Sequence, residues 1–103
     1  MFLVHSTFVQ PDLPAAEAAQ LTMRESAAAA AFQRSGVLAH LWREDGTRNA
    51  WAIWTVETEQ ELRRVLATLP WSKHMEFEMV SVSAHPNSLD RREQHDMRKA
   101  PEQ

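Results

Sequence analysis

The stretch VLAHLWREDGTRNAWAIWTV, residues 37–56, places two runs rich in aliphatic and aromatic side chains on either side of an Asp-Gly pair. Asp-Gly between two such runs is a strong signal for a β-hairpin. For an even loop, the expected cross-strand pairs are Arg43 with Arg48, Leu41 with Ala50, Ala39 with Ala52 and Val37 with Trp54. One face of this hairpin is then small in its middle, and the opposite face is aromatic.

The segments flanking the hairpin predict one further strand and one helix on each side. Residues 2–10 are typical of a strand, and a helix is expected from Pro14 to about Ser35, with Gly36 ending it. After the hairpin, TEQE at 58–61 is a capping box before a second helix that Pro70 stops, and 75–84 alternates as a strand.

The order β-α-β-β-α-β predicts a ferredoxin-like α+β fold, with a four-stranded antiparallel sheet and both helices on one face. We expect one domain over 1–89 and a polar C-terminal tail over 90–103. In a chain of 103 residues, a second copy is expected to cover the open face of the sheet. This is the association of a dimeric α+β barrel.

Composition excludes several classes of function. The net charge of −3 disfavours nucleic acid and anionic membranes as partners. The chain has no cysteine, and its two glycines exclude a Gly-rich phosphate loop. The five histidines show no metal-ligand spacing, so no metal is expected, and nothing in the sequence indicates a flavin, nucleotide or haem cofactor. The stretch MFLVHSTFVQ lacks the features of a secretory signal, and a cytoplasmic location is expected.

Glu25 is the candidate for catalysis. At helical spacing it falls in one band with Leu21, Ala28 and Phe32, on the face expected to meet the sheet. A buried carboxyl tends to have a raised pKa, which suits a general acid/base near neutral pH. The alternative is a glutamate at the edge of the stripe that reaches solvent or pairs with an arginine; periodicity alone leaves both open.

The hairpin adds candidate residues for a substrate pocket beneath the helices. Arg43 and Arg48 at its end could hold an anionic group, or they could be solvated at a strand end. The residues expected to shape the pocket are Ala28, Ala29, Ala50 and Trp54.

Several short motifs in this order resemble the muconolactone delta-isomerase family. They are Gln20–Leu21, Glu25, Gln33–Arg34, Gly36, HLWR at 40–43, Gly46, Leu69–Pro70, Met75, Glu78 and HPNSL at 85–89. The resemblance runs without gaps from about residue 20 to 89.

The resemblance implies a ferredoxin-like subunit in a closed homo-oligomer, with the dimer as unit and a decamer in family members. It also implies cofactor-free chemistry in the 3-oxoadipate route of aromatic degradation. The family converts muconolactone to an enol-lactone, and related members are chloromuconolactone dehalogenases. Its catalytic glutamate corresponds to Glu25.

The substrate-contacting residues depart from the family pattern. Where the family offers a tyrosine and, two residues on, an asparagine, this chain has Arg48 and Ala50. Asn49 has the wrong strand parity to replace that asparagine unless a bulge shifts it. We therefore expect an isomerase that moves a proton on a small lactone, with Glu25 as acid/base and a substrate that can differ from muconolactone. The alternatives are a cofactor-free monooxygenase or cyclase acting on a polycyclic aromatic, and a non-catalytic binding oligomer.

Overall fold

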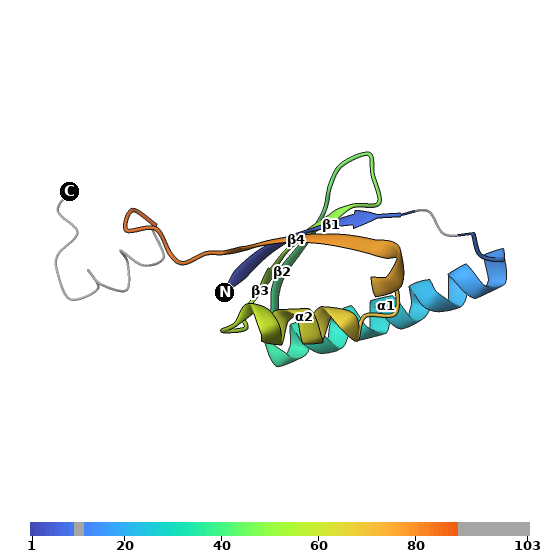
Figure 1. The fold of residues 1–103 in the computed structure, drawn as a ribbon, viewed down its shortest axis with the longest axis horizontal. Coiled ribbons are helices and arrows are strands. Elements are labelled where there is room, and N and C mark those ends of the chain that lie inside the picture. The colour runs from blue at the N-terminus through green and yellow to red at the C-terminus, as the bar shows by residue number, and fades with distance from the viewer. Residues whose placement is uncertain (10–11, 89–103) are drawn as a thin grey trace.

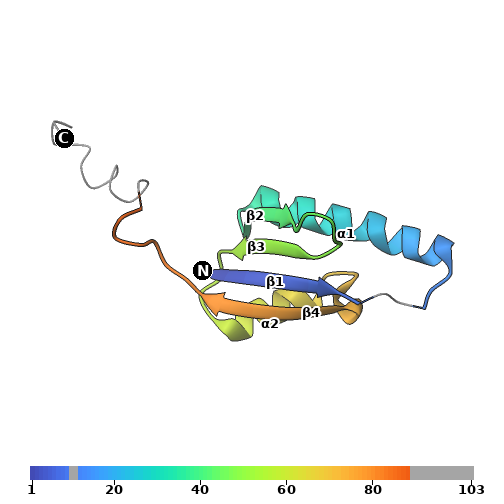
Figure 2. The ribbon, with the colours of Figure 1, turned by 90° about the horizontal axis from the view of Figure 1, so that it is seen from above.

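The computed structural model describes residues 1–9 and 12–88 of the chain. Its elements are β1 (Phe2–Phe8), α1 (Ala15–Ser35), β2 (Leu38–Arg43), β3 (Ala50–Trp54), α2 (Glu59–Ala67), the short 3₁₀ helix η1 (Ser72–His74) and β4 (Met75–Ser81) (Figure 1). The sheet has the order β2-β3-β1-β4 with antiparallel pairing throughout (Figure 2). This confirms the predicted ferredoxin-like α+β fold. The tail predicted over 90–103 lies outside the described residues.

The two helices begin and end at the residues whose chemistry favours those positions. Gly36 has φ 83°, and its backbone N–H donates to the Gln33 carbonyl at the end of α1. Glycine accepts this left-handed conformation without the steric penalty of a Cβ atom. At the start of α2, the Thr58 hydroxyl accepts the Glu61 N–H at 3.1 Å, as the capping-box pattern predicts.

Both helices lie on the same side of the sheet (Figure 1), and the core fills the space between the layers. The core consists of Phe2, Val4, Leu38, Ala52, Trp54, Val56, Leu62, Leu66 and Leu69. Phe32 of α1 packs edge-on against Trp54 of β3, with ring centroids 5.4 Å apart. Ala28 and Ala29 also pack against this core, so the predicted apolar stripe of α1 does face the sheet.

The hairpin closes with a longer loop than the even two-residue turn predicted. Arg43 pairs with Ala50, and Leu41 with Ala52, so the expected pairs Arg43–Arg48 and Leu41–Ala50 are both wrong. A two-residue turn of the type favoured by Asp-Gly needs positive φ at both positions. Among the described residues only Gly36 and Gly46 have positive φ, so Asp45 does not supply it.

Hydrogen bonds within the loop close the hairpin at Glu44 and Asn49 instead. The Glu44 N–H donates to the Asn49 carbonyl at 2.9 Å, and the Thr47 hydroxyl donates to the Glu44 carbonyl at 2.9 Å. The Thr47 hydroxyl also accepts the Asn49 N–H at 3.0 Å. Arg48 thereby lies in the loop rather than within a strand.

A bulge at Ala39 makes the pairing at the start of β2 differ from the predicted one. Leu38 pairs with Trp54 and His40 with Ile53, so the register shifts between them. Leu38 is therefore buried on the helix side of the sheet, while Ala39 is exposed. The predicted pairs of Ala39 with Ala52 and of Val37 with Trp54 are wrong, because one extra residue in β2 reverses the facing of everything before it.

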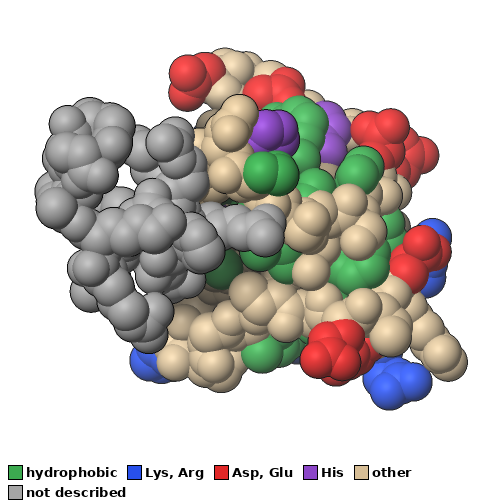
Figure 3. Space-filling model, turned by 90° about the vertical axis from the view of Figure 1, so that its left-hand side faces the viewer, with side chains coloured by type: hydrophobic (Ala, Val, Ile, Leu, Met, Phe, Trp, Pro, Cys, Tyr) green, Lys and Arg blue, Asp and Glu red, His purple; other side chains and the backbone are tan. Residues whose placement is uncertain are grey.

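The helix-free face of the sheet is aromatic, as predicted. His5 stacks on Trp51 with ring centroids 4.3 Å apart, and its Nε2 lies 2.9 Å from Glu44 Oε1. Trp42 is 51% exposed. In Figure 3, histidine side chains lie on the upper, helix-free side of the molecule, with hydrophobic side chains beside them. The covering of this face by a second copy stays a prediction.

The described part of the chain contains no helix long and apolar enough to cross a membrane.

Replacement of Leu62 by alanine should destabilise the fold. Leu62 is fully buried in the core, and removal of a buried leucine side chain costs about 2–5 kcal/mol. Urea unfolding at fixed protein concentration measures the difference. Met23→Ala, at a side chain that is 73% exposed on α1, is the control and should change the free energy of unfolding by less than about 0.5 kcal/mol. Equal effects of the two substitutions would contradict the placement of the core.

Candidate active site

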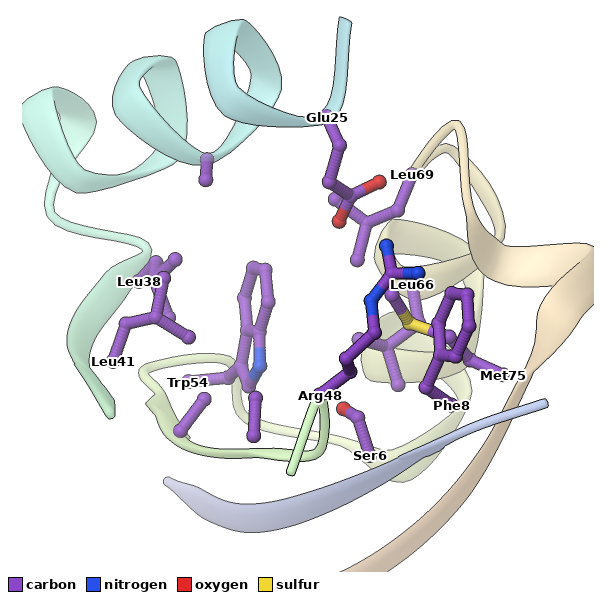
Figure 4. A pocket seen from close by; sticks show the side chains of 13 residues that line it. Ser6, Phe8, Glu25, Leu38, Leu41, Arg48, Trp54, Leu66, Leu69 and Met75 are labelled. Carbon is purple, nitrogen blue, oxygen red and sulfur yellow. The ribbon is translucent and has the colours of Figure 1, made fainter. Parts of the chain in front are cut away.

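Two adjoining hollows lie between α1 and the sheet. The inner hollow has a volume of about 70 Å³ and is shown in Figure 4. The outer hollow, nearer solvent, has a volume of about 440 Å³. Their shared walls include Glu25, Arg48, Ala29 and Ala50. The carboxyl and the guanidinium therefore stand where the two hollows meet.

Glu25 projects from α1 towards the sheet (Figure 4) and is half-buried. Its Oε1 accepts the backbone N–H of Trp71 at 2.9 Å. Burial raises the pKa of the Glu25 carboxyl above its ordinary value of 4.5, and the hydrogen bond from Trp71 opposes this rise only in part. Among the described residues no cation lies within 4.0 Å of the carboxylate, so it is not in an ion pair there.

Small side chains on α1 leave room beside Glu25. Ala29, one turn further along the helix, lines both hollows. Ala28 packs against the core and is not among the lining residues of either hollow. The alanine-rich stretch therefore has two roles, close packing on one side and an open wall on the other.

Arg48 reaches the site from the loop between β2 and β3. Its guanidinium carbon lies 3.9 Å from the centroid of the Phe8 ring and 5.9 Å from that of Trp71. In Figure 4 the guanidinium lies beside the Phe8 ring and on the same side of the hollow as Glu25. Within residues 1–9 and 12–88, no carboxylate oxygen lies within 4.0 Å of it. The aromatic stacking fixes its position and leaves its charge without an acidic partner.

The structure brings most of the predicted pocket residues to this site. Ala50 lines both hollows, Trp54 lines the inner one and Arg43 the outer one. Asn49 also lines the outer hollow, but its Oδ1 accepts the Phe8 N–H at 2.9 Å. The side-chain amide oxygen of Asn49 is therefore engaged in holding the loop against β1.

The wall residues that were not predicted from the sequence include Phe8, Trp71 and Met75. Phe8 and Met75 face the hollow from opposed positions on β1 and β4, and Trp71 lies between α2 and η1. Alternation along β1 places Phe8 on the same side as the buried Phe2 and Val4, so this signal was present. Nothing in the local sequence marks the backbone N–H of Trp71 as a donor to Glu25.

The chemistry available at this site is proton transfer on a small anion. A carboxyl group with a raised pKa can both accept and donate a proton near neutral pH. A guanidinium without an acidic partner can hold a carboxylate or an oxyanion. In the described residues, no three side chains of His, Cys, Asp or Glu gather as a metal site would need.

The fold and the site together place the chain among small ferredoxin-like α+β enzymes. The family model for muconolactone delta-isomerase matches residues 1–88, and the chain belongs to this family. The chain is 33% identical over 81 residues to muconolactone delta-isomerase 1 of Acinetobacter lwoffii. The matched stretch covers 79% of this chain and 84% of the relative. It is 32% identical over 77 residues to muconolactone delta-isomerase of Acinetobacter baylyi, covering 75% and 80% of the two chains.

A solved structure agrees with these relatives. The crystal structure of a muconolactone isomerase superposes with a TM-score of 0.77 at 31% sequence identity, covering 85% of this chain and 93% of the other. The chain is accordingly an enzyme of the muconolactone isomerase type.

Replacement of Glu25 by glutamine should change the pH dependence of stability. The folded-state pKa of Glu25 lies above 4.5, so the folded protein binds more protons than the unfolded chain between the two pKa values. Wild-type stability therefore falls as the pH rises through that interval. Because a glutamine oxygen can still accept the Trp71 N–H, Glu25→Gln should be more stable than the wild type at about pH 7–8, with a smaller difference below the ordinary carboxyl pKa.

Urea unfolding at a series of pH values measures this difference. Glu57→Gln, at an exposed side chain in the loop before α2, is the control, and it should change the free energy of unfolding by less than about 0.5 kcal/mol throughout. A Glu25→Gln effect that is constant with pH would contradict the burial-induced rise in pKa.

Proposed function

We propose that this protein is an intramolecular isomerase that moves a proton on a small, muconolactone-like lactone, with Glu25 as the general acid/base. The observation that carries the proposal is the position of the half-buried Glu25 carboxyl and the Arg48 guanidinium at the junction of the two hollows. The names of the relatives support the choice of reaction. The identity of about 30% to these relatives leaves room for a different substituent pattern on the lactone.

In the proposed reaction, the Glu25 carboxylate removes a proton from the ring carbon next to the lactone carbonyl, or from its vinylogous position. The C–H bond breaks, and its electron pair moves into a new C=C bond as negative charge develops on the carbonyl oxygen. The old C=C bond then takes up the proton at its far carbon, returned by the Glu25 carboxyl. Substrate and product have the same atoms and oxidation state, so no co-reactant is consumed.

The raised pKa of Glu25 suits both halves of this transfer. A rise in pKa makes the carboxylate a stronger base towards the ring proton, and the carboxyl group then returns that proton. Acid/base catalysis by a positioned group contributes about 10²–10⁴-fold, and holding the ring carbon close to the carboxylate contributes further. The Trp71 N–H that binds Oε1 orients the carboxylate for this role.

Arg48 is proposed to bind the carboxylate of the substrate. Its guanidinium is held over Phe8, so little side-chain freedom remains to be lost when an anion binds. Arg43, at the outer hollow, adds positive charge along the approach. Asn49 supports this arrangement from behind, because its bond to the Phe8 N–H ties the loop that carries Arg48 to β1.

Muconolactone in deuterated buffer tests the reaction and the base together. Wild-type protein should incorporate solvent deuterium and form the enol-lactone, and Glu25→Gln should lose at least about 10²-fold of the rate because the acid/base group is gone. NMR follows both events, and circular dichroism of the variant shows that it is folded. Full turnover by Glu25→Gln would refute Glu25 as the base. The absence of both exchange and product with the wild type, on muconolactone and on its ring-methylated analogue alike, would refute the lactone isomerase itself.

Replacement of Arg48 by methionine should weaken substrate binding more than it slows the chemical step. A charge-assisted hydrogen bond to a carboxylate contributes about 1.5–3 kcal/mol, so KM should rise roughly 10- to 100-fold with a smaller change in kcat. Arg48→Lys should recover only part of the loss, because an ammonium lacks the planar fork that stacks on Phe8. Arg64→Ala, at an exposed side chain of α2, is the control. An unchanged KM in Arg48→Met would remove Arg48 from the binding site.

A further inference from the structure

The two hollows differ in the polar groups of the walls that they do not share. Residues that line only the outer hollow are Thr22, Ser26, Trp42, Arg43, Asn49 and Trp71. Residues that line only the inner hollow are Ser6, Leu38, Ala52, Trp54, Leu66 and Leu69. The outer walls thus carry hydroxyls, an amide and a cation beside two indoles. The inner walls are aliphatic apart from the Ser6 hydroxyl and the Trp54 indole.

The inner walls are also rigid and remote from solvent. Leu38, Ala52, Trp54 and Leu66 are each no more than 3% exposed, and all belong to the core. Trp54 is fixed further by its edge contact with Phe32. Side chains packed in this way do not collapse into the space beside them without losing contacts elsewhere. The inner hollow is therefore a built part of the core rather than a surface irregularity.

The aliphatic end of the inner hollow is a poor place for water. The volume of about 70 Å³ exceeds the roughly 10–15 Å³ that one water needs on this scale, and Ser6, Glu25 and Arg48 offer polar partners at one end of it. A stable water needs two to four polar partners, and the walls made by Leu38, Ala52, Leu66 and Leu69 offer no polar side-chain atom. An apolar group of a few atoms fits both the size and the chemistry of this space.

Glu25 and Arg48 define how a ligand lies across the junction. Each of these two side chains lines both hollows. When Arg48 holds the carboxylate of the substrate, the lactone ring lies beside Glu25 and its far side faces Trp54 and Ala52. In Figure 4, Trp54 stands across the inner hollow from Arg48. We propose that the substrate is a lactone carboxylate bearing an alkyl substituent on the ring, away from the carboxylate arm, which fills the inner hollow. This inference rests on the proposed function, since it takes the lactone carboxylate from there.

A binding experiment tests the substituent separately from turnover. The probes are two saturated five-membered lactone acetic acids, one unsubstituted and one with a methyl group on the ring, titrated into the protein in a calorimeter. Burial of one methyl group should make the second probe bind about fourfold more tightly to the wild type. Ala52→Val adds two methyl groups in the space that the ring methyl would occupy. The ratio of the affinity of the methylated probe to that of the unsubstituted probe should therefore fall to one or below. Valine is favoured in strands, so β3 should still form.

Two further variants keep the test independent of folding defects. Ala29→Val fills the hollow from α1 instead of the sheet and should also abolish the advantage. Ala39→Val makes the same change on an exposed strand position outside both hollows and should keep it. Thermal unfolding of each variant verifies the fold.

The outcomes separate this inference from the proposed function. A fourfold advantage that Ala52→Val and Ala29→Val abolish and Ala39→Val retains supports the alkyl-lactone. Equal affinities for the two probes, no binding of either probe, or an advantage that survives both filling variants would overturn it. If one of these contradicting results is found together with Glu25-dependent deuterium exchange into muconolactone, the proposed isomerase is retained and only the alkyl substituent is rejected. Selective binding of the methylated probe without exchange would overturn the isomerase alone.

Discussion

The hydrogen bond from the Trp71 backbone N–H to the Glu25 carboxylate joins two parts of the chain that are 46 positions apart. A carboxyl group on the sheet-facing side of a helix loses hydration, and this loss must be balanced by a donor or a cation. Here one backbone donor supplies part of the balance, and no described cation supplies the rest. The group therefore keeps a raised pKa while its orientation is fixed. The same contact ties the loop after α2 to the middle of α1.

The Arg48 guanidinium, the cation of the site, is positioned by a different kind of contact. Arg48 has no acidic partner among the described residues, and its guanidinium is positioned by the ring of Phe8 instead. A carboxylate partner would have fixed it as firmly but would have neutralised it for a ligand. Aromatic stacking positions the group and keeps its charge available. The two charged groups thus belong to separate elements, Glu25 to a helix and Arg48 to a loop.

Local patterns predicted the elements and the facing of the helices well. Helical periodicity placed Glu25 towards the sheet, and the capping residues Gly36 and Thr58 lie where their backbone chemistry requires. The hairpin register was wrong because an Asp-Gly pair fits both a two-residue turn and a four-residue loop. Only the conformation of Asp45 decides between them, and side-chain chemistry does not dictate it. The bulge at Ala39 adds a second shift that no composition signal marks. The donor at Trp71 is a backbone N–H, so the residue type at this position does not predict its hydrogen bond to Glu25.

The position of Arg48 in a loop has a consequence for how this scaffold diversifies. The ladder hydrogen bonds of the hairpin close at Glu44 and Asn49, and the core residues lie on the strands and helices on either side. Exchange of the side chain at position 48 therefore leaves ladder and core intact. Selection can act on ligand preference at this position at little cost to folding, whereas Glu25 is constrained by the helix packing around it. A lineage with this architecture can acquire new substrates by altering a loop while it inherits its chemistry unchanged.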